Sequence, residues 1–232
     1  MKKVIYAVLF IFAVSSMSLQ AQTSFDKDMT TLHKNIFKTC GMIKSKTGHD
    51  DAKTLKSLAD LKDQINMLQK NYVKNIPKEY ANDPLFGSYF YQLKDVVDIL
   101  SERVARSDYK SATMNCSNFC KTFNKMHLIN GTLDLTDVMF MWKMQMSLTN
   151  FMMDAHNYKG ANHNVVKIPD IYKMVIGQKN KKNNADFNKQ FEALDMSYQK
   201  WIKAVNAKDY KEALKEAKVF DGAFPMVFKN SL

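Results

Sequence analysis

Glycine and proline are scarce in this 232-residue chain, which contains seven and four of them respectively. An all-β protein uses both residue types at its many turns, so their scarcity argues against that class. Arginine is rarer still, since only Arg103 and Arg106 occur. Proteins that recognise nucleic-acid sequences rely on arginine for bidentate contacts, so we expect no nucleic-acid partner. Long stretches with a 3.6-residue apolar period predict an all-α protein instead.

Motifs of common enzyme classes are also missing from the sequence. It contains no glycine-rich phosphate loop, no Gly-x-Ser-x-Gly elbow, no His-Glu-x-x-His and no Cys-x-x-Cys. Paired acids such as Asp50 and Asp51 stand at expected helix starts, where a carboxylate favours the helix dipole. We therefore expect that this protein is not an enzyme.

The N-terminal segment predicts export. Lys2 and Lys3 precede the apolar run 4–14, and a small residue, Ala21, stands at the end of a short polar stretch. This arrangement is typical of a signal peptide over residues 1–21, cleaved after Ala21. The run is shorter than the roughly 20 residues needed to cross a bilayer, and no later segment is predicted to be transmembrane. We expect a periplasmic or secreted protein.

Loss of that segment would leave 32 basic and 23 acidic residues, almost all of the basic ones lysine. Such a surface attracts anionic lipid, polysaccharide or an acidic protein weakly. The simpler interpretation is a solvated lysine-rich surface. The partner could be an unknown protein or a component of the cell envelope.

The chain contains a degenerate internal repeat. Residues 86–127 align without a gap on residues 187–228, at a constant offset of 101. The tripeptide Asp108-Tyr109-Lys110 recurs as Asp209-Tyr210-Lys211, and the identical apolar positions are spaced by three or four, as one face of a helix requires. These identities are Phe86/Phe187, Phe90/Phe191, Leu93/Leu194, Val104/Val205, Phe119/Phe220 and Phe123/Phe224. Such helices bury their apolar faces by antiparallel packing.

We therefore predict an antiparallel helical bundle, internally duplicated, with repeats at 22–128 and 132–232. A single fused domain of six to eight helices is the competing architecture. In the first repeat, three helices are expected at 26–46, at 51–73 and from Pro84 to about Arg106. A fourth helix, capped by Ser107-Asp108, is expected to run to about His127. In the second repeat, a helix capped by Thr136 or Asp137 runs to Tyr158. A less regular stretch, 160–184, with a short helical candidate at Ile171–Ile176, follows it, and the last two helices are expected at 185–206 and 209–229.

The candidate chemistry is a stripe of Cys116, Cys120 and His127 on the fourth helix. Residues at i, i+4 and i+11 share a helical face, and ligands that project inward from a helix can bind a metal ion or cofactor in a bundle. Cys40 joins this stripe if the first and fourth helices are neighbours, which would give a metal site of Cys40, Cys116, Cys120 and His127. The alternatives are buried structural thiols or a disulfide, although the pair at i, i+4 suits a disulfide poorly.

Methionine is abundant, with 16 residues, six of which lie between Met139 and Met153 and precede His156. Thioether and imidazole ligands suit Cu(I) in an exported protein. These methionines surround their helix rather than forming one cluster, so we interpret them as core packing.

The first repeat resembles the cytochrome c-prime and cytochrome b562 group of four-helix bundles, over roughly residues 26–127. The resemblance rests on an exported helical unit with Cys116 and Cys120 on its last helix, followed by Phe123. In c-type members, Cys-x-x-Cys-His attaches haem; here the spacing is one residue longer and Lys121 stands where the axial histidine belongs. The resemblance implies a haem held by Cys116 and Cys120, with Lys121 or His127 as axial ligand. A haem-free relative is equally consistent.

The sequence leaves two functions open. The first is a non-catalytic bundle that binds haem or a soft metal ion such as copper, for electron transfer, sensing or metal handling. The second is a cofactor-free interaction protein of the periplasm or envelope. In the second repeat, Ala217 and Asp221 replace Cys116 and Cys120, so the fold itself does not require these thiols.

Overall fold

The computed structural model describes residues 24–45, 48–182 and 184–232. The predicted signal peptide, 1–21, lies outside these residues. The all-α prediction is confirmed, because every regular element in the described ranges is a helix and none is a strand. No helix within those ranges is both long and apolar enough to cross a membrane.

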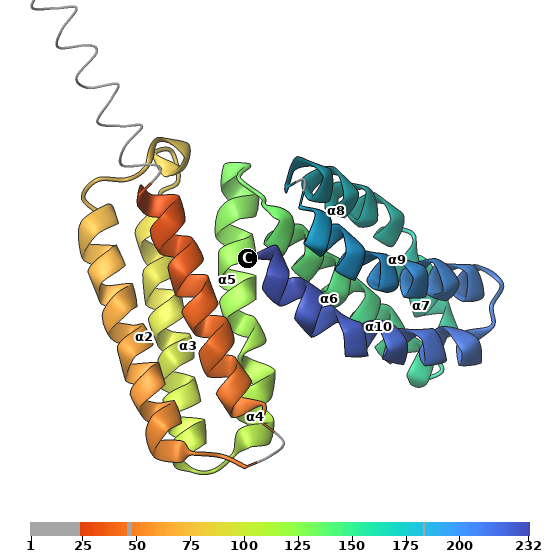
Figure 1. Cartoon of the computed structure of the whole chain (residues 1–232), viewed down its shortest axis with the longest axis horizontal. Helices are drawn as coiled ribbons and strands as arrows, with labels where there is room; N and C mark the ends of the chain where they lie inside the picture. The colour runs from red at the N-terminus through yellow and green to blue at the C-terminus, as the bar shows by residue number, and fades with distance from the viewer. Residues whose placement is uncertain (1–23, 46–47, 183) are drawn as a thin grey trace, which may run out of the picture. The chain divides into compact units, whose positions relative to one another are not determined.

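The chain divides between Thr132 and Leu133 into two compact units. The first contains an N-terminal helix at 24–43, α2 (Asp51–Tyr72), a short 3₁₀ turn η1 (Lys78–Tyr80), α3 (Phe86–Ala105), α4 (Tyr109–Asn115) and α5 (Ser117–Asn130). Here α3 packs against α2, α4 and α5, and the long helices lie side by side (Figure 1). Each helix turns one apolar stripe inward, and the stripes meet in one core that includes Leu32, Leu58, Phe90 and Phe119.

The second unit contains α6 (Leu135–Asp154), α7 (Tyr158–Val165), α8 (Ile168–Lys182), α9 (Ala185–Asn206) and α10 (Tyr210–Ser231). In this unit α6 packs against α7, α8 and α10, and α9 packs against α10. Trp142 is the centre of its core. Its indole ring lies 4.8 Å from the ring of Phe220 and 5.0 Å from that of Tyr198, centroid to centroid, both edge-on.

Two predictions about helices were wrong. The stretch 160–184 is more helical than expected, because α7 and α8 occupy most of it, and the short candidate at Ile171–Ile176 is only part of α8. Pro169 does not prevent the second of these helices, since it lies in the first turn, where its missing N–H has no intrahelical partner to lose. The fourth helix of the first unit is also not continuous but divides at Cys116. The break is slight, because Cys116 keeps helical φ and ψ of −53° and −32°.

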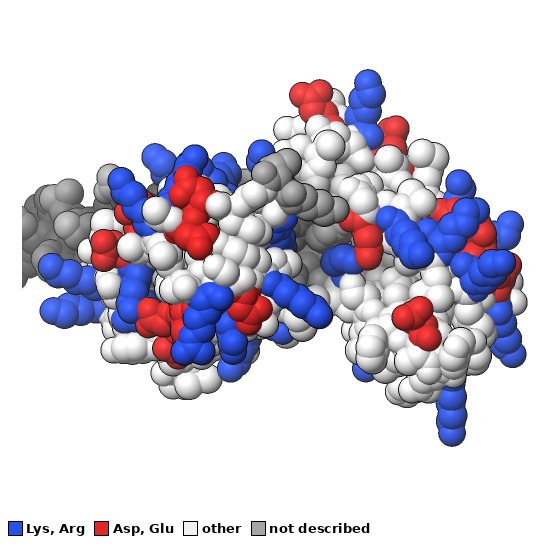
Figure 2. Space-filling model, turned by 90° about the horizontal axis from the view of Figure 1, so that it is seen from below, with Lys and Arg blue, Asp and Glu red and all other residues white. Residues whose placement is uncertain are grey.

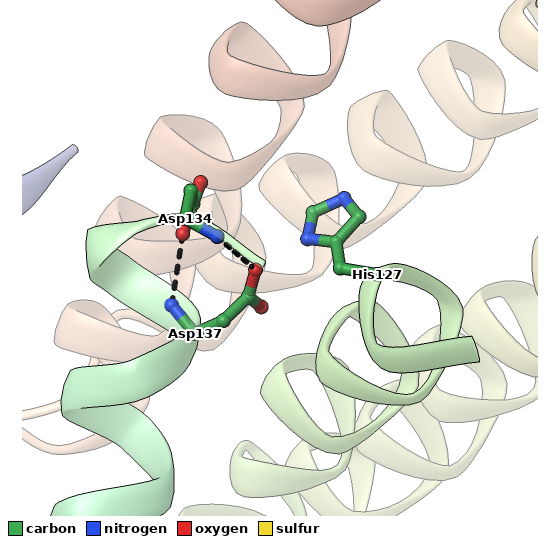
Figure 3. A group of neighbouring side chains, drawn as sticks. All are labelled: His127, Asp134 and Asp137. Atoms are coloured by element: carbon green, nitrogen blue, oxygen red, sulfur yellow. Dashed lines mark hydrogen bonds between the residues drawn. The ribbon is translucent and has the colours of Figure 1, made fainter. Parts of the chain in front are cut away.

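The start of α6 also differs from prediction. Its N-cap is Asp134, not Thr136 or Asp137. The Asp134 carboxylate accepts a hydrogen bond of 2.9 Å from the Asp137 N–H, and the Asp137 carboxylate accepts one of 3.1 Å from the Asp134 N–H (Figure 3). This reciprocal capping box satisfies two backbone donors, so α6 begins two or three residues earlier than predicted.

Three turns between helices share one geometry and the sequence pattern Asp-Tyr-Lys or Asn-Tyr-Lys. The turns at 108–110 and 209–211 were found in the sequence, and Asn157-Tyr158-Lys159 is a third that the alignment missed. Each cap oxygen accepts a hydrogen bond from the N–H three residues later, at 3.1, 3.0 and 3.1 Å. A residue with positive φ precedes each cap: Ser107 at 55°, His156 at 57° and Lys208 at 60°.

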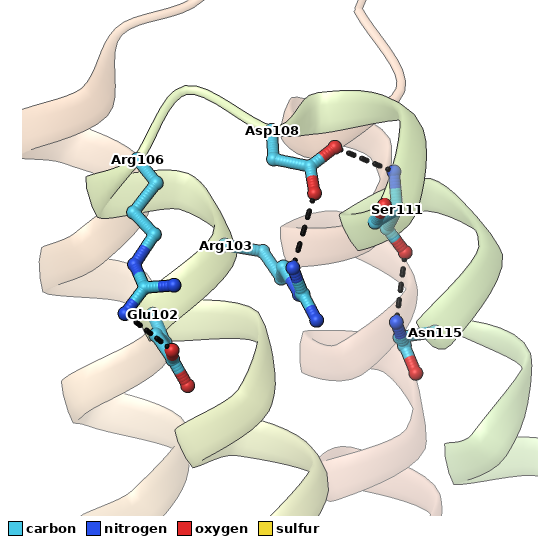
Figure 4. A network of polar contacts seen from close by, with 6 residues as sticks. All are labelled: Glu102, Arg103, Arg106, Asp108, Ser111 and Asn115. Atoms are coloured by element: carbon cyan, nitrogen blue, oxygen red, sulfur yellow. Dashed lines mark hydrogen bonds and ion pairs between the residues drawn. The ribbon is translucent and has the colours of Figure 1, made fainter.

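Figure 4 shows the first of these turns. Arg103 approaches the Asp108 carboxylate at 3.3 Å, and Arg106 forms an ion pair of 2.8 Å with Glu102. Hydrogen bonds from Ser111, with Arg103 nearby, hold the pKa of Asp108 below its usual value. At all three turns an Asp or Asn side chain caps the next helix, and a residue other than glycine takes the positive φ before it.

Candidate functional site

A disulfide bond joins Cys40 to Cys116 in the first unit. Cys40 lies near the end of the N-terminal helix, and Cys116 lies where α4 meets α5; their Cα atoms are 6.0 Å apart. Both side chains are buried, at 7% and 4% exposed. The local sequence explains this placement, because Cys40 continues the buried stripe of Leu32 and Ile36, and Cys116 follows the buried Ala112 by one turn.

The bond prevents Cys40 and Cys116, two of the four predicted metal ligands, from binding a metal ion as thiolates. It also differs from the disulfide that the sequence analysis considered, between Cys116 and Cys120. Cys40 and Cys116 lie on different helices, so their side chains can point toward each other, which two cysteines on one face of a helix cannot readily do.

The third cysteine contacts a histidine that the sequence analysis did not select. The Sγ of Cys120 lies 3.9 Å from Nε2 of His33. His33 is 7% exposed and stacks on Phe123, with ring centroids 4.5 Å apart. One signal in the sequence pointed to it: His33 precedes Cys40 by seven residues, two helical turns, and so shares its face.

The two predicted axial ligands lie in different surroundings. Lys121 is exposed, and its ammonium donates a hydrogen bond of 3.1 Å to the side chain of Asn118. The His127 ring is half-buried, 6.3 Å from the ring of Phe123 and 6.4 Å from that of Tyr80. Lys121 therefore points to solvent, while His127 forms part of an aromatic group beside α5.

Aromatic side chains fill the interior next to the cysteines. Phe119 and Phe123, one residue before and three after Cys120, are 0% and 1% exposed. A planar macrocycle bound at Cys116 and Cys120 would have to displace them, and closely packed interiors oppose such insertion. These residues of the first unit form a site with one disulfide, one thiol and one neighbouring imidazole.

The second unit makes a comparable contact without sulfur. Asp221, which aligns with Cys120, forms an ion pair with Lys143 of α6. Ala217, which aligns with Cys116, is buried at 4% exposed. An ion pair and a small apolar residue thus occupy the positions that hold a thiol and a disulfide in the first unit.

The comparisons were made with protein-family models, with curated proteins and with solved structures, and no match to this chain was found. The resemblance to the cytochrome c-prime and b562 group therefore stays a prediction. Any assignment of function has to come from the geometry of the chain itself.

Proposed function

We propose that this chain is an exported, internally duplicated helical bundle that acts by binding a macromolecular partner, without haem, metal or catalysis. The observation that carries this proposal is the buried disulfide between Cys40 and Cys116. It gives the cysteines a structural role, and disulfides of this kind persist in oxidising compartments such as the periplasm or the extracellular space. The disulfide thus supports export and removes Cys40 and Cys116 as ligands.

Duplication is supported by the first helix of each unit. The N-terminal helix aligns with α6 at an offset of 110, and the buried positions coincide: Phe25/Leu135, Met29/Met139, Leu32/Trp142, Ile36/Met146, Thr39/Thr149 and Ile43/Met153. At the same offset, His33 corresponds to Lys143. The contact of His33 with Cys120 therefore has its counterpart in the ion pair of Lys143 with Asp221. Equivalent contacts between equivalent helices are what a duplicated bundle requires.

The partner that we propose carries anionic groups and belongs to the envelope. Lysine and arginine outnumber aspartate and glutamate by 34 to 23. Figure 2 shows basic and acidic side chains intermixed on the face it presents. An intermixed surface gives weak, salt-sensitive attraction rather than a strong field of one sign.

A second candidate function keeps the soft metal ion. The specific observation is the 3.9 Å separation of Cys120 Sγ and His33 Nε2. Bond lengths of about 2.3 Å to sulfur and 2.0 Å to nitrogen place two ligand atoms roughly 3.5 Å apart at a tetrahedral angle. A thiolate with an imidazole suits copper or zinc. In this version His33 replaces Cys40, Cys116 and His127 in the ligand set.

An intact native mass spectrum of the protein, recovered from its own exported compartment, tests the proposal. We expect the polypeptide mass less two hydrogens, for one disulfide. Added mass equal to a haem would overturn the cofactor-free function. Added mass of one metal ion that disappears in Cys120→Ala and His33→Gln, but persists in the control His127→Gln, would establish the second candidate instead.

A further inference from the structure

From Phe140 to Met152 the outward face of α6 carries apolar residues and one serine. Met144, Leu148 and Phe151 are exposed at 39%, 43% and 70%, and Phe140, Met141, Ser147 and Met152 are half-buried beside them. At about 100° per residue these seven positions form one continuous arc of the helix surface, without a charged residue. The opposite face of α6 carries the core residues Met139, Trp142 and Met146.

A helix at a protein surface normally carries polar and charged residues on the face turned away from the core. The equivalent helix of the first unit is ordinary in this respect. At the offset of 110, the exposed positions of α6 correspond to Lys34, Lys38 and Gly41, and Phe140 and Met141 correspond to Thr30 and Thr31, all exposed. The bundle therefore does not need apolar residues on this face. This comparison rests on the duplication proposed above; the exposure and composition of the α6 face do not.

We infer that the outward face of α6 binds the same face of a second copy of this chain, as an antiparallel pair of helices. Two-fold symmetry sets each copy's face against itself, so the surface must be self-complementary. In an antiparallel pair whose dyad passes beside Leu148, Leu148 meets its symmetry mate, and Met144 lies opposite Met152 and next to Phe151 of the other helix.

Charge placement favours this orientation. Lys143 and Asp154 are eleven residues apart, three helical turns, so both lie along the same edge of the face. The dyad brings Lys143 of one copy opposite Asp154 of the other, twice. Lys143 already binds Asp221 within its own unit, and an ammonium group has donors for a second carboxylate. On the rest of the surface, the excess of lysine makes two copies repel each other. The outward face of α6 has no lysine at the centre of the proposed contact.

The apolar area of the α6 face limits the strength of the proposed dimer. The three exposed side chains present roughly 300 Å² of apolar surface, taking about 200 Å² for a side chain of this size. Two copies would cover about 600 Å² through these side chains, well below the roughly 1,200–2,000 Å² of stable interfaces. The dimer is therefore weak and depends on protein concentration.

Sedimentation equilibrium of the full processed protein tests the inference, over concentrations of about 1–300 µM. The Cys120→Ala background removes the thiol that could link copies by itself. We expect a monomer–dimer equilibrium whose dissociation constant rises at least about 100-fold in Met144→Lys with Leu148→Lys. Both changes introduce the residue type that the first unit carries at these positions, so the fold should tolerate them. Met196→Lys, an exposed position of α9, is the matched control and should leave the constant unchanged.

Cross-linking tests the geometry separately. In the same background, Leu148→Cys should form a disulfide-linked dimer under mild oxidation, and Lys38→Cys, its counterpart in the first unit, should not. A monomer at every concentration would overturn the inference, as would a dimer that the paired lysines leave intact. Loss of binding to anionic vesicles in the paired-lysine variant of a monomeric protein would assign the face to lipid instead. None of these readouts depends on whether a cofactor is bound.

Discussion

Reduction of the disulfide should destabilise the first unit selectively. Cys40 and Cys116 are 76 residues apart in sequence. In the loop-closure account, a link across a loop of that length restricts the unfolded chain by about 4.5 kcal/mol at 25 °C. At a urea m-value of about 2 kcal/mol/M, the midpoint of unfolding of the first unit should fall by about 2 M.

The two tryptophans make this prediction sharp. Trp142 and Trp201 both belong to the second unit. Tryptophan fluorescence therefore follows the second unit alone, while far-ultraviolet circular dichroism follows the helices of both. We expect Cys40→Ala with Cys116→Ala, or a reducing agent, to move the unfolding of the first unit, followed by circular dichroism, to lower urea concentration. The fluorescence transition of the second unit should stay in place. Cys120→Ala is the control and should move neither midpoint strongly.

Two outcomes would refute the reasoning. An unchanged dichroism midpoint after reduction would mean that the bond does not restrict the unfolded chain of the first unit. An equal shift in the fluorescence transition would mean that the two units unfold as one, against their separate cores.

Three further predictions concern a buried carboxylate, a backbone position with positive φ and a buried hydrogen bond. Burial raises the pKa of Asp83, but hydrogen bonds from Asn130 and the backbone lower this pKa by more, so the folded pKa lies below the unfolded value. The stabilisation that this carboxylate gives is therefore present above about pH 4 and is lost as the pH falls through the folded pKa. Asp83→Asn should remove that part of the acid dependence in urea titrations followed by circular dichroism. Lys208→Gly should stabilise the second unit by about 0.5–1 kcal/mol, because φ of 60° strains a residue with a Cβ; an unchanged fluorescence midpoint in urea would contradict this. Asn150→Ala should cost about 1–3 kcal/mol by leaving the Trp201 indole N–H without its 2.8 Å partner, and Asn150→Asp, which keeps the acceptor, should recover most of the loss in the same assay.

The helices and their turns could be predicted because their determinants are local. The apolar period, caps such as Asp50 and Asp209, and the paucity of glycine act within a few residues of the chain. The stretch 160–184 was misjudged for the same reason. α7 has only 8 residues, and α8 buries only Ile168 and Val175, so packing of both helices against α6 adds stability that the local pattern does not display.

The sequence by itself determined the helical class, the similarity of residues 86–127 to 187–228, and the fact that the second of these segments lacks the cysteines. Only the tertiary structure decided that Cys40 bonds to Cys116, that His33 meets Cys120, and that the apolar arc of α6 faces outward. The physical reason is that a helical period states which side of a helix is buried but not which helix lies beside it. Several arrangements of the same helices bury the same stripes, and the choice among them depends on contacts between residues far apart in the chain.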